Sequence, residues 1–340
     1  MRLRGIPLAV LALVAAAAFP LAAQTHEPTR SDAVNPARER LEQEAHDAAR
    51  VPEEVDIITP HITDSYHMEI PWWRPPFYKE VCLGRHVGEH GCEPLWEPIH
   101  IGGFEIQLSP TKHVVMLLVA ATLCAIVLIG TARAHVRHTH EVGRPKGFAA
   151  GIEAMILYLR NEIILRNVGP HGNGYVPYLL SLFFFILFAN LLGLIPFGST
   201  ATGNIAVTSM LAILSFIVIE ISGIRALGTH YLSTIFYWNK DLALPIRIVM
   251  FLIMSPVEFV AKLTKPFALA IRLFANMTAG HIVVLAFIGL IFAFMGPAAS
   301  APFLMAIGIM LLEIFVAFLQ AFIFTLLTAV FIGQIREAHH

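Results

Sequence analysis

One arginine inside a long apolar hairpin constrains this chain more than any other feature. From Pro266 to Ile335 the only formally charged side chains are Arg272 and Glu313, with His281 titratable between them. An arginine at the bilayer centre costs about 2.5–3.5 kcal/mol on insertion scales, and it cannot shed the charge by deprotonation. Such a residue is retained only when it acts on ions or on an acidic partner inside the membrane.

The composition predicts an all-α polytopic membrane protein. Of the 340 residues, 56% are hydrophobic and 14% are charged, which excludes an ordinary soluble domain. We expect a membrane domain over residues 111–340 with about five membrane helices. The expected spans are residues 113–132, 176–196, 204–221, 245–295 and 303–335. Residues 151–168 mix apolar and charged side chains, so they predict an amphipathic helix at the membrane interface.

The last two helices are too long for upright spans. At 1.5 Å per residue, a continuous helix over residues 245–295 would reach roughly 75 Å, whereas the hydrocarbon core is about 30 Å thick. We therefore expect this helix to be tilted, bent or broken. Residues 296–300 read GPAAS and predict a turn, so the two helices form an antiparallel hairpin.

The N-terminal region predicts export. Arg2 and Arg4 precede an apolar stretch and a run of small residues, which is the layout of a signal peptide over residues 1–23. An uncleaved anchor is the alternative, because the cleavage site is imperfect. Residues 24–110 are polar and form an exported segment. The basic residues between 133 and 146 mark the cytoplasmic side, so we expect the C-terminus inside.

Two cysteines of the exported segment allow two interpretations. Cys82 and Cys92 bracket a turn-rich loop, and an oxidising compartment favours a disulfide between them. The alternative is a metal site that adds His86 and His90 to the two thiols. Cys124 lies in an apolar helix and is expected to be a small core residue.

Polar residues of the hairpin pair at matched positions. In an antiparallel hairpin, residues at the same level have numbers with a constant sum. Arg272 with Gln320 gives 592, His281 with Glu313 gives 594, and half of either sum falls on the Gly-Pro turn. Asn276 follows Arg272 by four residues and shares its face. This pattern predicts a vestibule that is accessible to ions and ends at the fixed positive charge of Arg272.

Each of these residues also has a simpler interpretation. His281 and Glu313 could be a structural hydrogen-bonded pair that holds the hairpin together. Arg272 could extend its side chain to the headgroups, although its depth beyond Lys265 argues against this. Gln320 alone would be an ordinary amide side chain that forms a hydrogen bond between two membrane helices. The combination at matched levels is more specific than any single member.

Three sequence strings carry a resemblance to a known family. Residues 269–281 read LAIRLFANMTAGH, residues 319–324 read LQAFIF, and residues 188–196 read FANLLGLIP. Together they resemble subunit a of the F-type ATP synthase, the stator half of its proton channel. The resemblance covers residues from about 109 to the C-terminus and does not extend to the exported segment.

The resemblance implies a mechanism and a set of partners. Arg272 would face a rotor ring of c subunits, each with a membrane carboxylate, and would favour the ionised carboxylate while blocking a direct path between two half-channels. The implied partners are the c-subunit ring, the b-subunit stator stalk, the rest of the complex and membrane lipid. The subunit would be non-catalytic, without cofactor, metal or nucleic-acid partner. Whether protons or sodium ions are carried depends largely on the c subunit.

The resemblance assigns site residues in two groups. The exported-side path would be lined by residues of the hairpin, namely Asn276, His281, Glu313 and Gln320. Weaker channel candidates are Asn190, Ser255, Glu258 and Thr264.

Other function classes were weighed. An unrelated ion channel or a secondary transporter would also use intramembrane charge, but transporters usually show repeated halves, and no internal repeat is visible. An intramembrane metalloprotease needs a His-Glu-x-x-His pair, which the sequence lacks. A membrane anchor alone would not need Arg272.

Overall fold

The structure is a computed structural model, and it places most of the chain from residue 64 onward. It describes residues 64–71, 78–87, 91–97, 99–101, 104–106, 109–139, 148–169, 172–195, 200–231, 244–294 and 296–337. The signal peptide predicted for residues 1–23, His90 of the alternative metal site and the basic residues 140–146 lie outside these ranges.

The described residues confirm an all-α membrane domain. Five helices are long and apolar enough to cross a membrane. They are α4 (Lys112–Thr139), α7 (Val176–Gly193), α8 (Ile205–Leu227), α10 (Leu244–Ala293) and α11 (Ser300–Glu337). Short 3-10 turns lie between or beside them: η4 (Gly172–Gly174), η5 (Ala201–Gly203), η6 (Gly228–Tyr231) and η7 (Gly296–Ala299).

The predicted amphipathic helix is a run of three helical pieces. They are α5 (Phe148–Tyr158), the π-helical η3 (Leu159–Ile164) and α6 (Leu165–Val168). Leu159 and Ile164 are buried, whereas Tyr158 and Glu162 are exposed. The run is therefore amphipathic, as the charge pattern predicted, and its position at the membrane interface stays a prediction.

The segment predicted to be exported contains strands that the sequence did not reveal. Three separate antiparallel pairs form, each of two strands. They are β1 (His67–Pro71) with β2 (Tyr78–Cys82), β3 (Arg85–Val87) with β4 (Gly91–Glu93), and β5 (Ile99–Ile101) with β6 (Phe104–Ile106). The pairs are short, so contacts other than strand pairing must hold this segment in place.

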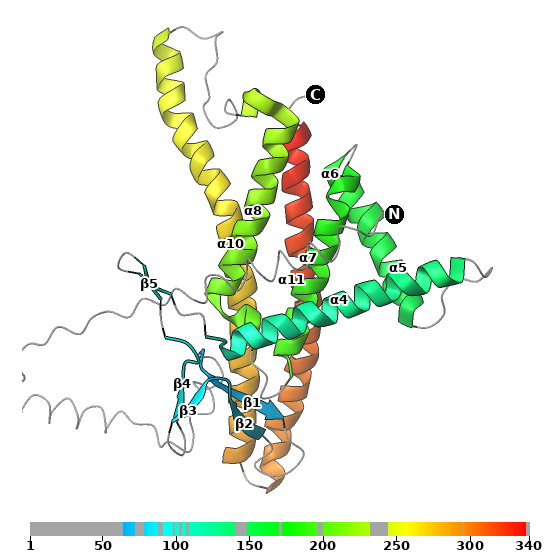
Figure 1. The fold of residues 1–340 in the computed structure, drawn as a ribbon, viewed down its shortest axis with the longest axis vertical. Helices are drawn as coiled ribbons and strands as arrows, with labels where there is room; N and C mark the ends of the chain where they lie inside the picture. Colours follow the sequence, from blue (N-terminus) through cyan, green and yellow to red (C-terminus); the bar gives the residue numbers. More distant parts are fainter. Residues whose placement is uncertain are drawn as a thin grey trace, which may run out of the picture.

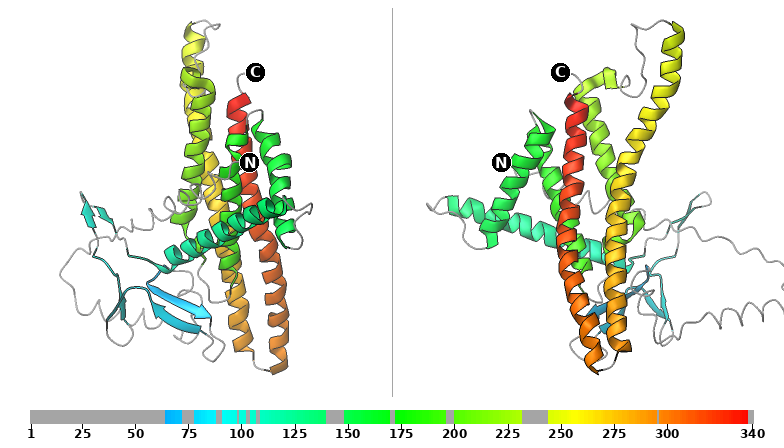
Figure 2. Two further views of the ribbon diagram at one scale, coloured as in Figure 1. Left: turned by 45° about the vertical axis from the view of Figure 1, so that its right-hand side comes forward. Right: turned by 180° about the vertical axis from the view of Figure 1, so that it is seen from behind.

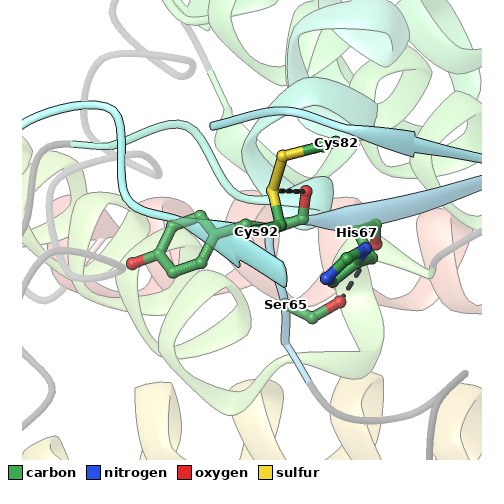
Figure 3. The surroundings of a disulfide bond; sticks show 5 residues. Ser65, His67, Cys82 and Cys92 are labelled. Carbon is green, nitrogen blue, oxygen red and sulfur yellow. Dashed lines mark hydrogen bonds between the residues drawn. A yellow bond between two sulfur atoms is a disulfide. The ribbon is translucent and has the colours of Figure 1, made fainter. Parts of the chain in front are cut away.

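A disulfide joins two of these pairs. Cys82 ends β2 and Cys92 lies in β4, and their sulfur atoms are bonded (Figure 3). Sγ of Cys92 also lies 3.5 Å from the carbonyl oxygen of Tyr66. Because each sulfur is bonded to the other in this structure, the thiolate ligands of the alternative metal site are absent from it.

Polar contacts attach the exported segment to the start of α4. Nδ1 of His113 lies 2.6 Å from Oδ1 of Asp64, and both side chains are largely buried. The backbone N–H of Lys112 donates to the carbonyl oxygen of Ser65 at 3.1 Å. The residues just before β1 are therefore held against the N-terminal end of α4.

Helix α7 forms the centre of the membrane bundle. Phe183, Phe184 and Phe185 are fully buried, and α7 packs against α4 on one side and α11 on the other. Helix α10 packs against α8 and α11 and forms the hairpin with α11 (Figures 1 and 2).

The two helices of the hairpin are long and unbroken. Helix α10 is one continuous helix of 50 residues despite Pro256 and Pro266 in its interior, and α11 has 38 residues. The 22-residue apolar part of α4 reaches about 33 Å, which matches a bilayer. Figures 1 and 2 show α4 running across the direction of α10 and α11. The tilt of the two long helices in the bilayer stays a prediction.

Candidate functional site

Arg272 points away from the bundle. Its neighbours Leu269, Ala270 and Leu273 are buried and fix this turn of α10, while Arg272 itself is exposed. Among the described residues, none forms a hydrogen bond or ion pair with it. A bare guanidinium on the surface of a membrane helix is costly.

Small and polar residues surround Arg272 on the same face. Ala268, Ala275 and Ala279 lie four residues before, three after and seven after it, and all are exposed. Asn276 is exposed as well, so it shares the face of Arg272 as predicted. Small side chains allow the backbone of another helix to approach closely. The surroundings of Arg272 are therefore suited to contact with a neighbouring helix.

A small polar cavity lies inside the hairpin next to this face. It leaves about 10 Å³ for the centre of a water-sized sphere, which is the space of roughly one water molecule. The lining residues come from α7, α10 and α11: Asn190, Leu273, Asn276, Met277, Glu313, Val316, Ala317 and Gln320. The structure thus brings together three predicted residues of the hairpin and one weaker candidate from α7.

Glycine at position 280 makes room for the Glu313 carboxyl group. A Cβ atom built on Gly280 would overlap Oε1 of Glu313 and would lie 2.8 Å from its Cδ. The two positions sum to 593, between the two sums obtained from the sequence, so the predicted register of the hairpin is confirmed here. Oε1 of Glu313 is buried and has no hydrogen-bond partner among the described residues. It is the acceptor that a water or a transferred proton would meet in the cavity.

His281 lies beside this contact without bonding to Glu313. Its side chain is buried on α10, one residue beyond Gly280. Glu313 makes no hydrogen bond or ion pair within the described parts of the chain, so its pairing with His281 stays a prediction. Gln320, two turns from Glu313 on α11, is buried as well.

A buried hydrogen-bond network forms the far wall of the cavity. Thr202 Oγ1 donates to Oδ1 of Asn190 at 2.8 Å, and Asn190 Nδ2 donates to the carbonyl oxygen of Ala317 at 3.3 Å. Asn190 and Thr202 are completely buried. Thr278 Oγ1 donates to the carbonyl oxygen of Gly203 at 3.4 Å. This network ties α7, η5, α10 and α11 together around the polar cavity.

Sequence analysis missed Thr202, Thr278 and Gly280. Thr278 and Gly280 lie inside the string at residues 269–281, but their partners are set by tertiary contacts that spacing alone does not reveal. Thr202 lies in the turn between two spans. The only signal for it is a polar run, STATGN, between two apolar stretches.

The remaining weak candidates lie away from the cavity. Ser255 is buried, Glu258 is exposed, and both precede Arg272 on α10 by more than three turns. Thr264 donates its hydroxyl to the carbonyl oxygen of Ala261 at 2.9 Å and borders an apolar groove of about 420 Å³ between α8 and α10. The structure therefore does not join these three residues to the polar cavity.

Comparison with known proteins gives one consistent family. The family model of the ATP synthase A chain matches residues 113–333. A protein of Anaeromyxobacter sp. (strain Fw109-5) named ATP synthase subunit a is 41% identical over 298 residues, covering 82% of this chain and 70% of the relative. Proteins of the same name are 46% identical in Chloroherpeton thalassium (69% of this chain, 68% of the relative) and 42% identical in Myxococcus xanthus (84% and 91%).

Proposed function

The chain belongs to the ATP synthase subunit a family, and we propose that it is the ion-translocating stator subunit of a bacterial ATP synthase. The observation that carries this proposal is the position of Arg272. Its guanidinium is exposed and unpaired among the described residues, and the adjacent residue Leu273 and Asn276, one turn on, line the polar cavity. In this function the subunit is not itself catalytic and works as part of the whole complex.

The partner of Arg272 in this proposal is a ring of c subunits with membrane carboxylates. A carboxylate supplied by another chain would neutralise the charge that this chain leaves unpaired. The exposed alanines at 268, 275 and 279 would let a ring helix approach the guanidinium closely. The b-subunit stalk would hold the chain in place while the ring turns.

The polar cavity belongs to the exported-side half-channel in this proposal. It lies between Arg272 and the η7 turn, and its acceptors are the side chains of Asn190, Asn276, Glu313 and Gln320. An ion that enters here would reach the ring carboxylate on one side of Arg272. His281, buried next to Gly280, would act on the protonation of Glu313. Ser255, Glu258 and Thr264 lie on the other side of Arg272, where the cytoplasmic half-channel would open.

Arg272 separates the two half-channels. Its fixed charge favours the ionised form of an approaching carboxylate, so the carboxylate releases its proton there. The same charge repels a proton that would pass directly from one half-channel to the other. Net flow then requires the ring to rotate, which couples ion movement to ATP synthesis. The topology that fits is a multi-pass protein of the bacterial inner membrane, with residues 24–110 exported and the C-terminus cytoplasmic.

Replacement of Arg272 tests this proposal. We expect Arg272→Ala to abolish ion-driven ATP synthesis in inverted membrane vesicles while the complex still assembles. Arg272→Lys should be severely impaired too, because lysine can lose its proton and lacks the planar guanidinium. The matched control is Arg225→Ala, since Arg225 is an exposed arginine at the end of α8. Near-normal synthesis by Arg272→Ala would refute the proposed role.

A further inference from the structure

A second set of charged side chains lies where α10 enters the bundle. From Leu244 to Val260, Ser255 is the one buried residue among the described side chains, and Leu252 is 70% exposed. Figures 1 and 2 show this first part of α10 diverging from α8. Lys262 follows within a turn and is buried. Lys262 is therefore the first buried charged residue of α10 among the described side chains.

Lys262 is held by two other elements. Its Nζ donates to Oη of Tyr231 at 2.9 Å and lies 4.3 Å from the centre of that ring. Oε1 of Glu220, on α8, is 3.9 Å from the same nitrogen. Tyr231 is itself buried, and it lies so close to Gly223 that a Cβ atom there would come within 2.6 Å of its ring. The ammonium group thus joins α10 to α8 and to η6.

Lys265 extends the contact to α11. Its Nζ lies 4.7 Å from the centre of the Phe331 ring. A lysine over an aromatic ring is attracted by the negative face of the ring, most strongly where water is excluded. We call the five residues Glu220, Tyr231, Lys262, Lys265 and Phe331 the lysine clamp.

The lysine clamp lies at one of the two turns of α10 that a proline interrupts. Pro266 has no N–H group, so the carbonyl oxygen of Lys262 lacks the bond it would accept in an ordinary helix. Proline inside a helix is the usual cause of a kink. The side chains of Lys262 and Lys265 therefore fix α10 to three neighbouring elements at a turn where its own hydrogen bonding is incomplete.

We propose that the lysine clamp is a positioning device that sets where Arg272 stands against the partner ring. Arg272 follows Lys262 by ten residues, or about 15 Å along the helix. A change of angle at the Pro266 turn would move Arg272 across the interface. An apolar side chain at position 262 could bury the same surface in several arrangements of the helices. The contacts of the Lys262 ammonium group with Glu220 and Tyr231 favour a single arrangement. This inference rests on the proposed function, because it needs Arg272 to act as the barrier between half-channels.

The test compares coupling with assembly in the intact synthase. Inverted vesicles are prepared with Lys262→Met, with Lys262→Arg and with the exposed control Arg225→Gln. Three quantities are measured: the amount of assembled complex, the rate of ATP hydrolysis, and the proton pumping it drives. We expect Lys262→Met to lower pumping per ATP hydrolysed by about 2- to 30-fold, the range for residues that act through others. Lys262→Arg and Arg225→Gln should keep the wild-type ratio.

A purely structural role would give a different result. It would reduce the amount of complex and leave pumping per ATP unchanged in the complexes that form, and that outcome would overturn the proposal. If Lys262→Met does not assemble, Tyr231→Phe decides, because it removes the hydroxyl partner and keeps the ring. It should lower the ratio at least about twofold, and an unchanged ratio would reject the clamp. Arg272→Ala in the same assay separates the two proposals. Normal coupling in Arg272→Ala would refute the role of Arg272 as a barrier. Loss of coupling in Arg272→Ala together with normal coupling in the Lys262 variants would refute only the lysine clamp.

Discussion

The contact between Gly280 and Glu313 gives the sharpest prediction, because one methyl group tests it. In Gly280→Ala the new Cβ would overlap Oε1 of Glu313 and lie 2.8 Å from Cδ and 3.2 Å from Cγ. Carbon atoms pack best at about 3.5–4.0 Å, so the carboxyl group must move by about 1 Å. It is the end of a flexible side chain, and the helices themselves need not separate.

The stability of Gly280→Ala should change little. Alanine is favoured over glycine in a helix by about 1 kcal/mol, while forcing Glu313 off its rotamer costs about 0.5–1.5 kcal/mol. These two terms nearly cancel. Ion flux should respond far more, because an error of about 1 Å in a reacting group can cost up to about a hundredfold in rate. We therefore expect flux to fall by about tenfold or more in a complex that assembles normally.

The assay is passive proton flux through membranes stripped of the catalytic sector, normalised to the amount of subunit in the membrane. Gly289→Ala is the matched control, since Gly289 lies on the same helix and a Cβ atom there would meet nothing within 4 Å. Equal flux in the two variants would show that the position of the Glu313 carboxyl group does not matter for translocation.

Three further predictions test neighbouring features. The exchanged double variant, His281→Glu with Glu313→His, should recover more flux than the product of the single changes to Ala allows; a double-mutant cycle with no recovery would mean that the two residues act independently. Thr202→Val removes the donor of a buried amide oxygen, so the complex should lose about 1–3 kcal/mol of stability, measured by thermal or denaturant unfolding. Mass spectrometry of alkylated, unreduced protein should show a peptide linked through Cys82 and Cys92, and alkylation of both residues would reject this bond.

The sequence was sufficient for the membrane helices and for the register of the hairpin. Long apolar stretches leave few alternatives to a helix in a bilayer, so the predicted spans agree with α4, α7, α8, α10 and α11 within a few residues at most ends. The register followed from the antiparallel sum, and the contact between Gly280 and Glu313 reproduces it. The largest errors are at two C-terminal ends: α4 continues to Thr139, seven residues beyond the predicted residue 132, and α8 continues to Leu227, six residues beyond the predicted Ile221.

Other features could not be read from one sequence. The three strand pairs are only three to five residues long, too short for a clear alternation of apolar and polar residues. The wall formed by Asn190 and Thr202 depends on a contact with Ala317, more than a hundred residues away. The contacts of Lys262 also depend on other elements of the fold, because its partners lie on α8 and η6. Such contacts follow from the packing of distant elements, which local periodicity does not contain.

Other basic side chains of α10 are paired within the chain, so the unpaired charge of Arg272 results from its position on the helix. The structure describes the side chains of three of them, Lys262, Lys265 and Arg272. Both lysines are held inside the chain, one by Glu220 and Tyr231 and the other over Phe331. Arg272 alone of the three faces outward without a partner among the described residues. Under the proposed function, the third cation stays unpaired within the chain because an acidic group on another chain meets it.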